Sequence, residues 1–213
     1  MRAWLLGLGL TLAICDAAAA APDALEVPPV LVTPEGFCVA DGSHPADAKV
    51  AAAMKKSLES ALGGKLLSLY RFCPGRPTTV GLVVISDQGP FAGTANSFVQ
   101  NVCGEFKAIT LAPPDMNRII ASVDKIAREE LGQPTVVRGL KVLSAVLESG
   151  VCYAFVQPEG ASKEPVMEIL SYVPIRNKVI MIMRVYGVTQ PSATRESYQH
   201  LRATIAALRR ANP

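Results

Sequence analysis

The amino-acid sequence predicts an α+β fold, in which an antiparallel sheet is covered by helices as an α/β/α sandwich. From residue 135 onward the sequence changes to strand-like segments joined by short turns, at about 135–147, 151–157, 166–173 and 178–187. Strands linked this closely form an antiparallel meander. The central strands are apolar on both faces, so helices must cover the sheet.

The residues before the meander predict the first strands and a helix. "EGFCVADGS" predicts a short strand, and "HPADAKVAAAMKKSLESALGG" predicts a helix with Pro45 in its first turn and two glycines at its end. Strands follow at 65–72 and 79–86, joined through the turn residues of "CPGRPT". The second of these strands is apolar almost throughout, which places it near the centre of the sheet.

Three further helices complete the expected order of elements. A weaker one covers about 93–106, and "PPDMNRIIASVDKIAREELG" predicts a stronger one that ends at a glycine. The chain closes with "SATRESYQHLRATIAALRR", a helix with one apolar stripe formed by Tyr198, Leu201, Ile205 and Leu208.

This order of elements resembles the PsbP/Mog1-like superfamily. The resemblance is carried by "TPEGFCV" at the start, by the meander "VMEILSYVPIRNKVIMIMRVYG" and by the closing "ESYQHLRATIAALRR". Members of that superfamily are mostly binding or assembly proteins, among them photosystem assembly subunits, a Ran-binding factor and bacterial envelope proteins. The resemblance implies a binding or assembly role. It carries over no functional residue, because the members share no catalytic constellation.

Residues 1–20 have the three-part plan of a secretory signal peptide. Arg2 gives the positive start, "AWLLGLGLTLAI" gives the apolar core, and a row of alanines gives the cleavage region. The apolar run is shorter than the roughly 20 residues that a membrane-spanning helix needs. We therefore expect a soluble periplasmic or secreted protein with no transmembrane segment after cleavage. Residues 21–34, with four prolines, predict an extended leader, and 35–213 predict a single domain.

Cys15 supports a different interpretation, a membrane-associated lipoprotein anchored at this cysteine. Lipoprotein processing requires a small residue just before the cysteine, and this sequence has Ile14 there. The alanines at 17–21 offer ordinary cleavage sites instead. The sequence therefore favours soluble export over a lipid anchor.

Charge and motifs exclude several classes of function. The formal net charge of +3 at pH 7 is a weak excess and argues against a nucleic-acid partner. The sequence has no G-x-S-x-G elbow, no phosphate-binding glycine loop and no H-E-x-x-H motif. His44 and His200 are isolated from each other and from cysteines at zinc-ligand spacing. We therefore expect no metal and no cofactor, and we assign no catalytic residue.

The polar loop "VVISDQGPFAGTANS" at 83–97 is a candidate binding site, because it leaves the end of a central strand. Ser86, Asp87 and Asn96 are its candidate contacts with a ligand or partner. The alternative is that the polar residues of this loop cap the following helix and close a turn.

Three arginines of the last helix form a second candidate contact surface. Arg195, Arg202 and Arg209 are spaced seven residues apart, which keeps them on one side of the helix beside its apolar stripe. Such arginines usually lay their stems over the edge of the core with the heads in water. The alternative is that they meet an anionic partner.

Taken together, these patterns predict an exported soluble envelope protein, non-enzymatic, that binds or assembles a partner protein or a small ligand. The second hypothesis is a small periplasmic hydrolase that uses the 86–97 loop. The third is the lipoprotein anchored at Cys15.

The cysteines predict two disulfides. Cleavage of the signal peptide leaves an even set in an oxidising compartment: Cys38, Cys73, Cys103 and Cys152. Three pairings are possible, and four buried free thiols are the alternative. We favour Cys38 with Cys73, which end a short strand and its expected neighbour. Cys103 with Cys152 would then tie a helix to the sheet that it covers.

The position of cleavage is the first testable prediction. The mature chain should begin at Ala20 or Ala21 and carry no acyl group, because the alanine row fits the signal peptidase and Ile14 does not fit lipoprotein processing. The intact mass of the exported protein measures both features. A mature chain that begins at an acylated Cys15 would contradict soluble export.

Overall fold

A computed structural model gives the positions of most of the chain after residue 27. The described residues are 28–40, 45–59, 64–73, 81–88, 91, 93–108, 121, 124–126, 128–129, 132, 137–160, 166–188 and 190–213. The predicted signal peptide, Cys15, His44 and most of the helix predicted at 113–132 lie outside the described residues. No helix in the described part of the chain is long and apolar enough to cross a membrane.

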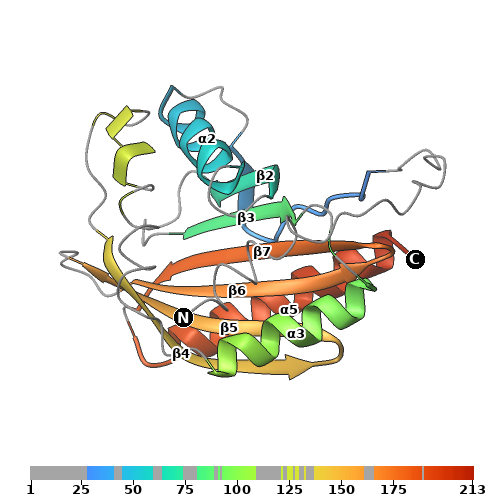
Figure 1. Cartoon of the computed structure of the whole chain (residues 1–213). Helices are drawn as coiled ribbons and strands as arrows, with labels where there is room; N and C mark the ends of the chain where they lie inside the picture. The colour runs from blue at the N-terminus through green and yellow to red at the C-terminus, as the bar shows by residue number, and fades with distance from the viewer. Residues whose placement is uncertain are drawn as a thin grey trace, which may run out of the picture.

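The described strands form one seven-stranded sheet in which all neighbours are antiparallel (Figure 1). Their order across the sheet is β1-β2-β3-β7-β6-β5-β4. The strands are β1 (Phe37–Val39), β2 (Lys65–Phe72), β3 (Gly81–Asp87), β4 (Val137–Glu148), β5 (Val151–Gly160), β6 (Val166–Ile175) and β7 (Lys178–Gly187). The predicted meander is therefore confirmed, and its last strand returns to pair with β3.

β7 lies at the centre of the sheet, between β3 and β6. Its side chains are buried on both faces, and the four residues from Val179 to Ile182 are at most 1% exposed. Successive side chains of a strand point to opposite faces. An apolar strand of this kind therefore requires a cover on each face of the sheet.

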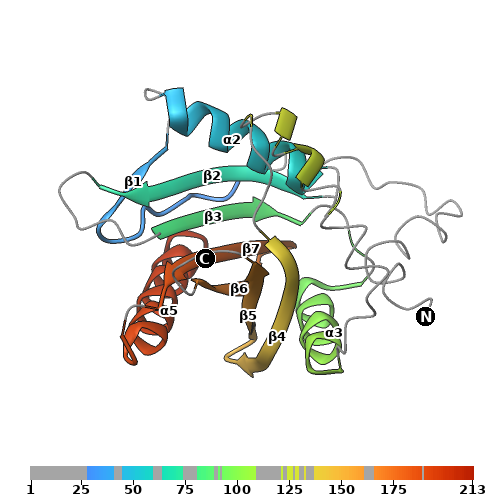
Figure 2. The same ribbon diagram turned by 90° about the vertical axis from the view of Figure 1, so that its left-hand side faces the viewer.

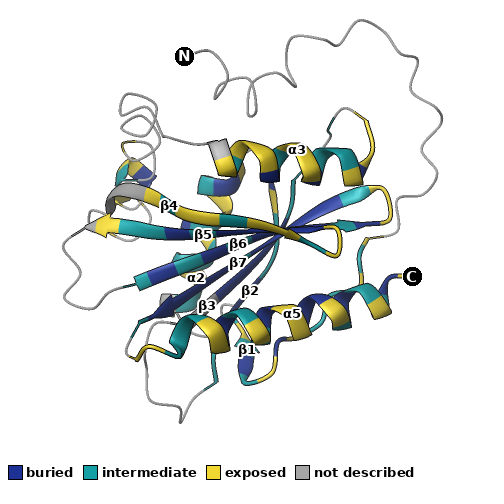
Figure 3. Cartoon of the chain, turned by 90° about the horizontal axis from the view of Figure 1, so that it is seen from below, coloured by how far each residue is buried: buried dark blue, intermediate teal, exposed yellow. Residues whose placement is uncertain are grey.

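The helix α5 (Ala193–Ala211) covers one face, which we call the α5 face (Figure 2). Its residues Leu201, Ile205 and Leu208 are at most 3% exposed and pack on side chains from β1, β2, β3, β5, β6 and β7. The outer side of the helix is exposed (Figure 3). The apolar stripe predicted for the last helix is thus its buried side.

Two helices cover the opposite face, α2 (Pro45–Ser57) and α3 (Ala95–Ala108). Met54 of α2 packs against Leu69 and Val84 of the first strands. Val99 of α3 packs with Val179 of β7. The mixed α+β class is confirmed, with helices on both faces of an antiparallel sheet.

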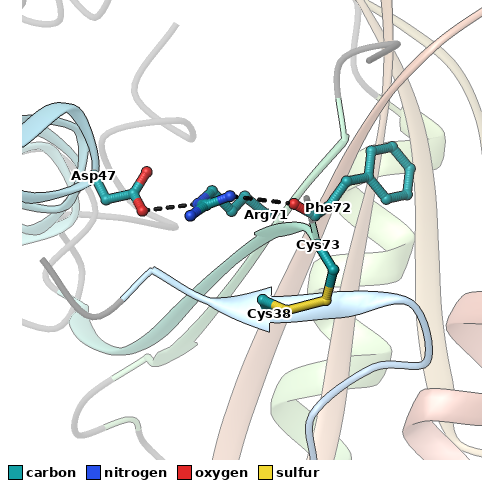
Figure 4. The surroundings of a disulfide bond; sticks show 5 residues. All are labelled: Cys38, Asp47, Arg71, Phe72 and Cys73. Atoms are coloured by element: carbon teal, nitrogen blue, oxygen red, sulfur yellow. Dashed lines mark hydrogen bonds and ion pairs between the residues drawn. A yellow bond between two sulfur atoms is a disulfide. The ribbon is translucent and has the colours of Figure 1, made fainter. Parts of the chain in front are cut away.

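The two predicted cysteine pairs are confirmed at disulfide distance. Cys38 of β1 joins Cys73, just after β2, with their Cα atoms 4.9 Å apart. Beside this pair, the Arg71 Nε donates a hydrogen bond of 2.7 Å to Asp47 Oδ2 and so ties β2 to α2 (Figure 4). Cys103 of α3 joins Cys152 of β5, with 5.3 Å between Cα atoms.

The last part of the predicted leader is attached to the domain. The Val30 N–H donates to Asn212 Oδ1 at 2.8 Å, and Asn212 Nδ2 donates to the Val30 carbonyl at 2.9 Å. Leu31 packs against the core of the α5 face. Residues 28–36 therefore lead into β1 and are bound to the C-terminal end of α5 by the contact between Val30 and Asn212.

Loss of either disulfide should destabilise the protein. The closed loops span 35 and 49 residues, for which the chain-entropy model gives about 4 kcal/mol each. Cys103 and Cys152 are at most 1% exposed, so replacing this pair by alanine also opens a cavity. We expect a lower Tm for both double-alanine variants, with the larger loss for the Cys103 pair.

Thermal unfolding with and without a reductant measures these effects. The reductant should lower the Tm of the wild type. It should lower the Tm of each double variant by a smaller amount, because only one disulfide is left to reduce. An unchanged wild-type Tm after full reduction would contradict a stabilising role.

Candidate functional site

The candidates at the end of β3 have partners inside the fold. Ser86 is fully buried, and its Oγ accepts a hydrogen bond of 3.0 Å from Gln88 Nε2. Asp87 forms an ion pair with Lys178 at 2.9 Å, at the start of β7. The Asp87–Lys178 ion pair joins β3 to β7, and the Ser86 hydroxyl is held within the end of β3 by Gln88.

The rest of the 86–97 loop shows the capping arrangement. The Ser97 N–H donates to Thr94 Oγ1 at 3.1 Å, and the Thr94 N–H donates to Ser97 Oγ at 3.0 Å. This reciprocal pair satisfies backbone donors at the start of α3. Asn96 is exposed in the first turn of the helix. The structure therefore agrees with the capping alternative for Thr94 and Ser97.

Two of the three candidate arginines hold α5 against the β4–β5 turn. Arg202 forms an ion pair of 2.7 Å with Glu148, which also accepts a hydrogen bond from the Tyr198 hydroxyl. Arg209 Nη1 donates to the Ser149 carbonyl at 2.9 Å. Arg195 is exposed in the first turn of α5. The seven-residue spacing thus places Arg202 and Arg209 on the side of α5 that meets the sheet edge.

The described residues contain no group of three or more histidine, cysteine, aspartate or glutamate side chains that would hold a metal ion. His200 lies beside the Phe37 ring, with 6.0 Å between the ring centroids. The observed position of this histidine is therefore at the edge of the α5-face core.

A pocket opens on the α5 face, between β4 and the first turn of α5. Its volume is about 430 Å³, which lies within the range of small-molecule sites. It is lined by Leu143, Ser144, Phe155, Gln157, Met167, Val188 and Thr194.

A β-bulge shapes the outer rim of this pocket. The register between β4 and β5 shifts between Val142 and Ser144, so that Leu143 is the extra residue. A bulge of this kind bends the strand and redirects a side chain. As a result, Leu143 lines the pocket beside Ser144 and remains 47% exposed.

The chemistry of the pocket is mainly apolar, with a few hydrogen-bonding groups at its walls. Ser144, Gln157 and Thr194 supply the polar side chains. Tyr186 lies next to the inner wall, because it pairs in register with Met167. Burial raises the pKa of the Tyr186 phenol, and the neighbouring Thr194 side chain acts in the opposite direction. This combination suits an apolar ligand with one polar end.

The α5 face also contains a buried cation, Arg184 of β7. Its side chain is 7% exposed, and its guanidinium carbon lies 4.7 Å from the centre of the Phe37 ring. Its Nε and Nη1 atoms have no hydrogen-bond partner among the described residues. Burial lowers the pKa of Arg184 to about 10. The guanidinium therefore stays charged at neutral pH, stabilised in part by the aromatic face.

Sequence reasoning did not find this pocket. Its lining residues come from β4, β5, β6, the residue after β7 and the first turn of α5. These segments are far apart in the sequence, and no sequence motif includes residues from two of them. The one available sign was the extra apolar residue in "LKVLSAVL", where strict alternation fails.

A partly buried carboxyl group lies on the opposite face of the sheet. Glu168 of β6 stands between Val156 of β5 and Val185 of β7 in the register. Burial of the carboxyl group raises the pKa of Glu168 to about 7. The folded state therefore favours the neutral acid over the carboxylate.

Stability should depend on pH through Glu168. Both folded and unfolded states hold the proton below about pH 4.5, and the folded state then loses stability as pH rises towards 7, by up to about 3 kcal/mol. Glu168→Gln removes this loss, so its Tm should exceed that of the wild type at pH 8 and not at pH 4. Glu159→Gln, an exposed glutamate of β5, is the matched control. A pH-independent difference would contradict the raised pKa.

Comparison with known proteins adds no family to these observations. A scan against protein-family models finds no match for the chain. A search of curated proteins likewise finds no significantly similar sequence.

Proposed function

We propose that this protein is an exported, soluble envelope protein that binds a ligand or partner without catalysing a reaction. The signal-peptide pattern supports export. The two cysteine pairs at disulfide distance are compatible with an oxidising compartment. In fold, we propose a PsbP/Mog1-like sandwich, a superfamily of mostly binding and assembly proteins, because the order of elements agrees with it.

The single observation that carries the binding proposal is the apolar pocket on the α5 face. Four of its lining residues are apolar, and the exposed Leu143 stands at its rim. Large apolar side chains that remain exposed around a hollow are typical of ligand or partner sites.

The ligand we propose has an apolar body and an anionic or hydrogen-bonding end. The apolar body would contact Leu143, Phe155 and Met167. The polar end would lie at Thr194, in the first turn of α5, where the positive end of the helix dipole favours an anion. A medium-chain carboxylic acid has this chemistry.

The hydrolase hypothesis gains no support from the described residues. Ser86 is fully buried, and Asp87 is paired with Lys178. A nucleophile must reach the substrate, and a general base must lie within hydrogen-bond distance of it. The lipoprotein hypothesis depends on Cys15, which lies outside the described residues.

Displacement of a fluorescent dye tests the pocket. Anilinonaphthalene sulfonate, an apolar anion, should bind the mature protein, and dodecanoate should displace it. Leu143→Asp should weaken both by about tenfold or more, because a carboxylate at the rim replaces an apolar contact and repels the anionic end.

The control is Val39→Asp. Val39 lies on β1, at the other edge of the described sheet, and is 47% exposed, like Leu143. It should leave the affinity unchanged. Equal affinities of wild type and Leu143→Asp, or no dye binding at all, would refute a ligand site in this pocket.

A further inference from the structure

The edge strand β4 is unusually apolar for a strand with an open side. It is the last strand in the order of the described sheet and pairs only with β5 there. Three of its large side chains are exposed: Leu143 by 47%, Val146 by 42% and Leu147 by 40%. A long edge strand with exposed apolar residues is a template for pairing with another strand.

The register assigns each exposed residue of β4 to a face. Val146 pairs with Tyr153, whose ring packs in the α5-face core, and Leu143 lines the pocket on that face. Leu147 pairs with Cys152, which packs with α3 on the opposite face. The edge is therefore apolar on both faces, and a cover on one face alone would leave part of it in water.

A second copy of β4 fits this edge in antiparallel orientation. With Ala145 on the two-fold axis, Ser144 and the bulged Leu143 stand together opposite Val146 of the second copy. Val142 then stands opposite Leu147. Each pair shares a face, as an antiparallel ladder requires.

The same register brings opposite charges together. One step beyond Val142, Lys141 stands opposite Glu148 of the second copy, and both point to the α5 face. Two-fold symmetry creates this pair twice, once at each end of the paired segment. Shifting the register by one residue would put each side chain opposite one from the other face.

We propose that β4 pairs with β4 of a second copy, which joins the two sheets into one across a two-fold axis. This occupant is favoured over an unrelated peptide because the charges and the apolar pairs of β4 complement themselves. Natural edge strands often carry a lysine and a bulge that discourage pairing. In the proposed register, the lysine, Lys141, stands opposite Glu148 of the second copy, and the bulged Leu143 stands opposite Val146 of the second copy.

Pairing would also complete the rim of the pocket. Val146 of the second copy stands beside Leu143, the exposed residue of the rim. This part of the inference rests on the proposed ligand site, whereas the pairing itself does not. Measuring the oligomeric state without ligand therefore separates a failure of the interface from a failure of the ligand proposal.

Sedimentation equilibrium of the mature protein tests the pairing. An interface of about eight residues per strand is small, so the concentration should range from about 1 to 500 µM. We expect a monomer–dimer equilibrium. Leu147→Asp, on the face away from the pocket, should weaken the dimer by at least about tenfold, because it places two carboxylates in the apolar contact.

Charge reversal identifies the register. Lys141→Glu should also weaken the dimer, and added salt should partly restore it, because salt screens the repulsion between the introduced carboxylate and Glu148 of the second copy. Lys49→Glu is the matched control, because Lys49 is exposed on α2, far from β4 in the sheet order. It should leave the dimer unchanged.

Cross-linking gives an independent readout that does not depend on a loss of stability. Ala145→Cys should form an intersubunit disulfide on mild oxidation, since residues opposite each other in an antiparallel pair have Cβ atoms about 5 Å apart. Lys49→Cys should not cross-link under the same conditions. A monomer at all concentrations, or a dimer insensitive to both β4 substitutions, would overturn the proposal.

Discussion

The structure depends on the pairing of β3 with β7. This contact joins the three strands that precede α3 to the four-stranded meander that follows, and no other strand pair connects these two parts of the described sheet. Seven consecutive residue pairs form the contact, from Gly81–Tyr186 to Asp87–Ile180. Val84, Ile85, Ile180 and Ile182 at this centre are fully buried. Because both strands are apolar on both faces, their pairing is stable only between two layers of helices.

The two ends of α5 differ in how they meet the sheet: one end is bound to the β4–β5 turn, and the other borders an open pocket. At the β4–β5 turn, Glu148 forms an ion pair with Arg202 and accepts a hydrogen bond from Tyr198. Arg209 donates a hydrogen bond to the Ser149 carbonyl of the same turn. Ser149 and Gly150 have positive φ values of 51° and 70°, as a tight two-residue hairpin requires. At the other end of α5, the bulged Leu143 of β4 lines the pocket together with Thr194. The pocket lies at this open end, where the helix begins.

Two ionisable side chains, the buried Arg184 and the partly buried Glu168, lie on opposite faces of neighbouring strands. Glu168 pairs with Val185, and Arg184 pairs with Ile169, so the two residues are one step apart in the ladder. Their side chains cannot meet, because successive residues of a strand point to opposite faces. Each group is therefore accommodated separately: the acid by a raised pKa, and the guanidinium by the Phe37 ring. A charge removed from water without a partner is costly, and both sites are places where this fold gives up stability.

Local patterning of the sequence predicts most of the strands and helices, and it favours the cysteine pairing that the structure shows. The strands at 65–72 and 178–187 were predicted with the bounds that the structure shows, because alternation and apolar runs report directly on burial. The same elements favoured one of the three possible cysteine pairings, and the positions of the cysteines in the fold confirm it. Three features follow from the three-dimensional arrangement alone: β7 inserts beside β3, Arg202 and Arg209 bind the β4–β5 turn, and Leu143 lines a pocket together with Thr194. These features join residues far apart in the chain, and local periodicity carries no information about which distant side chains meet.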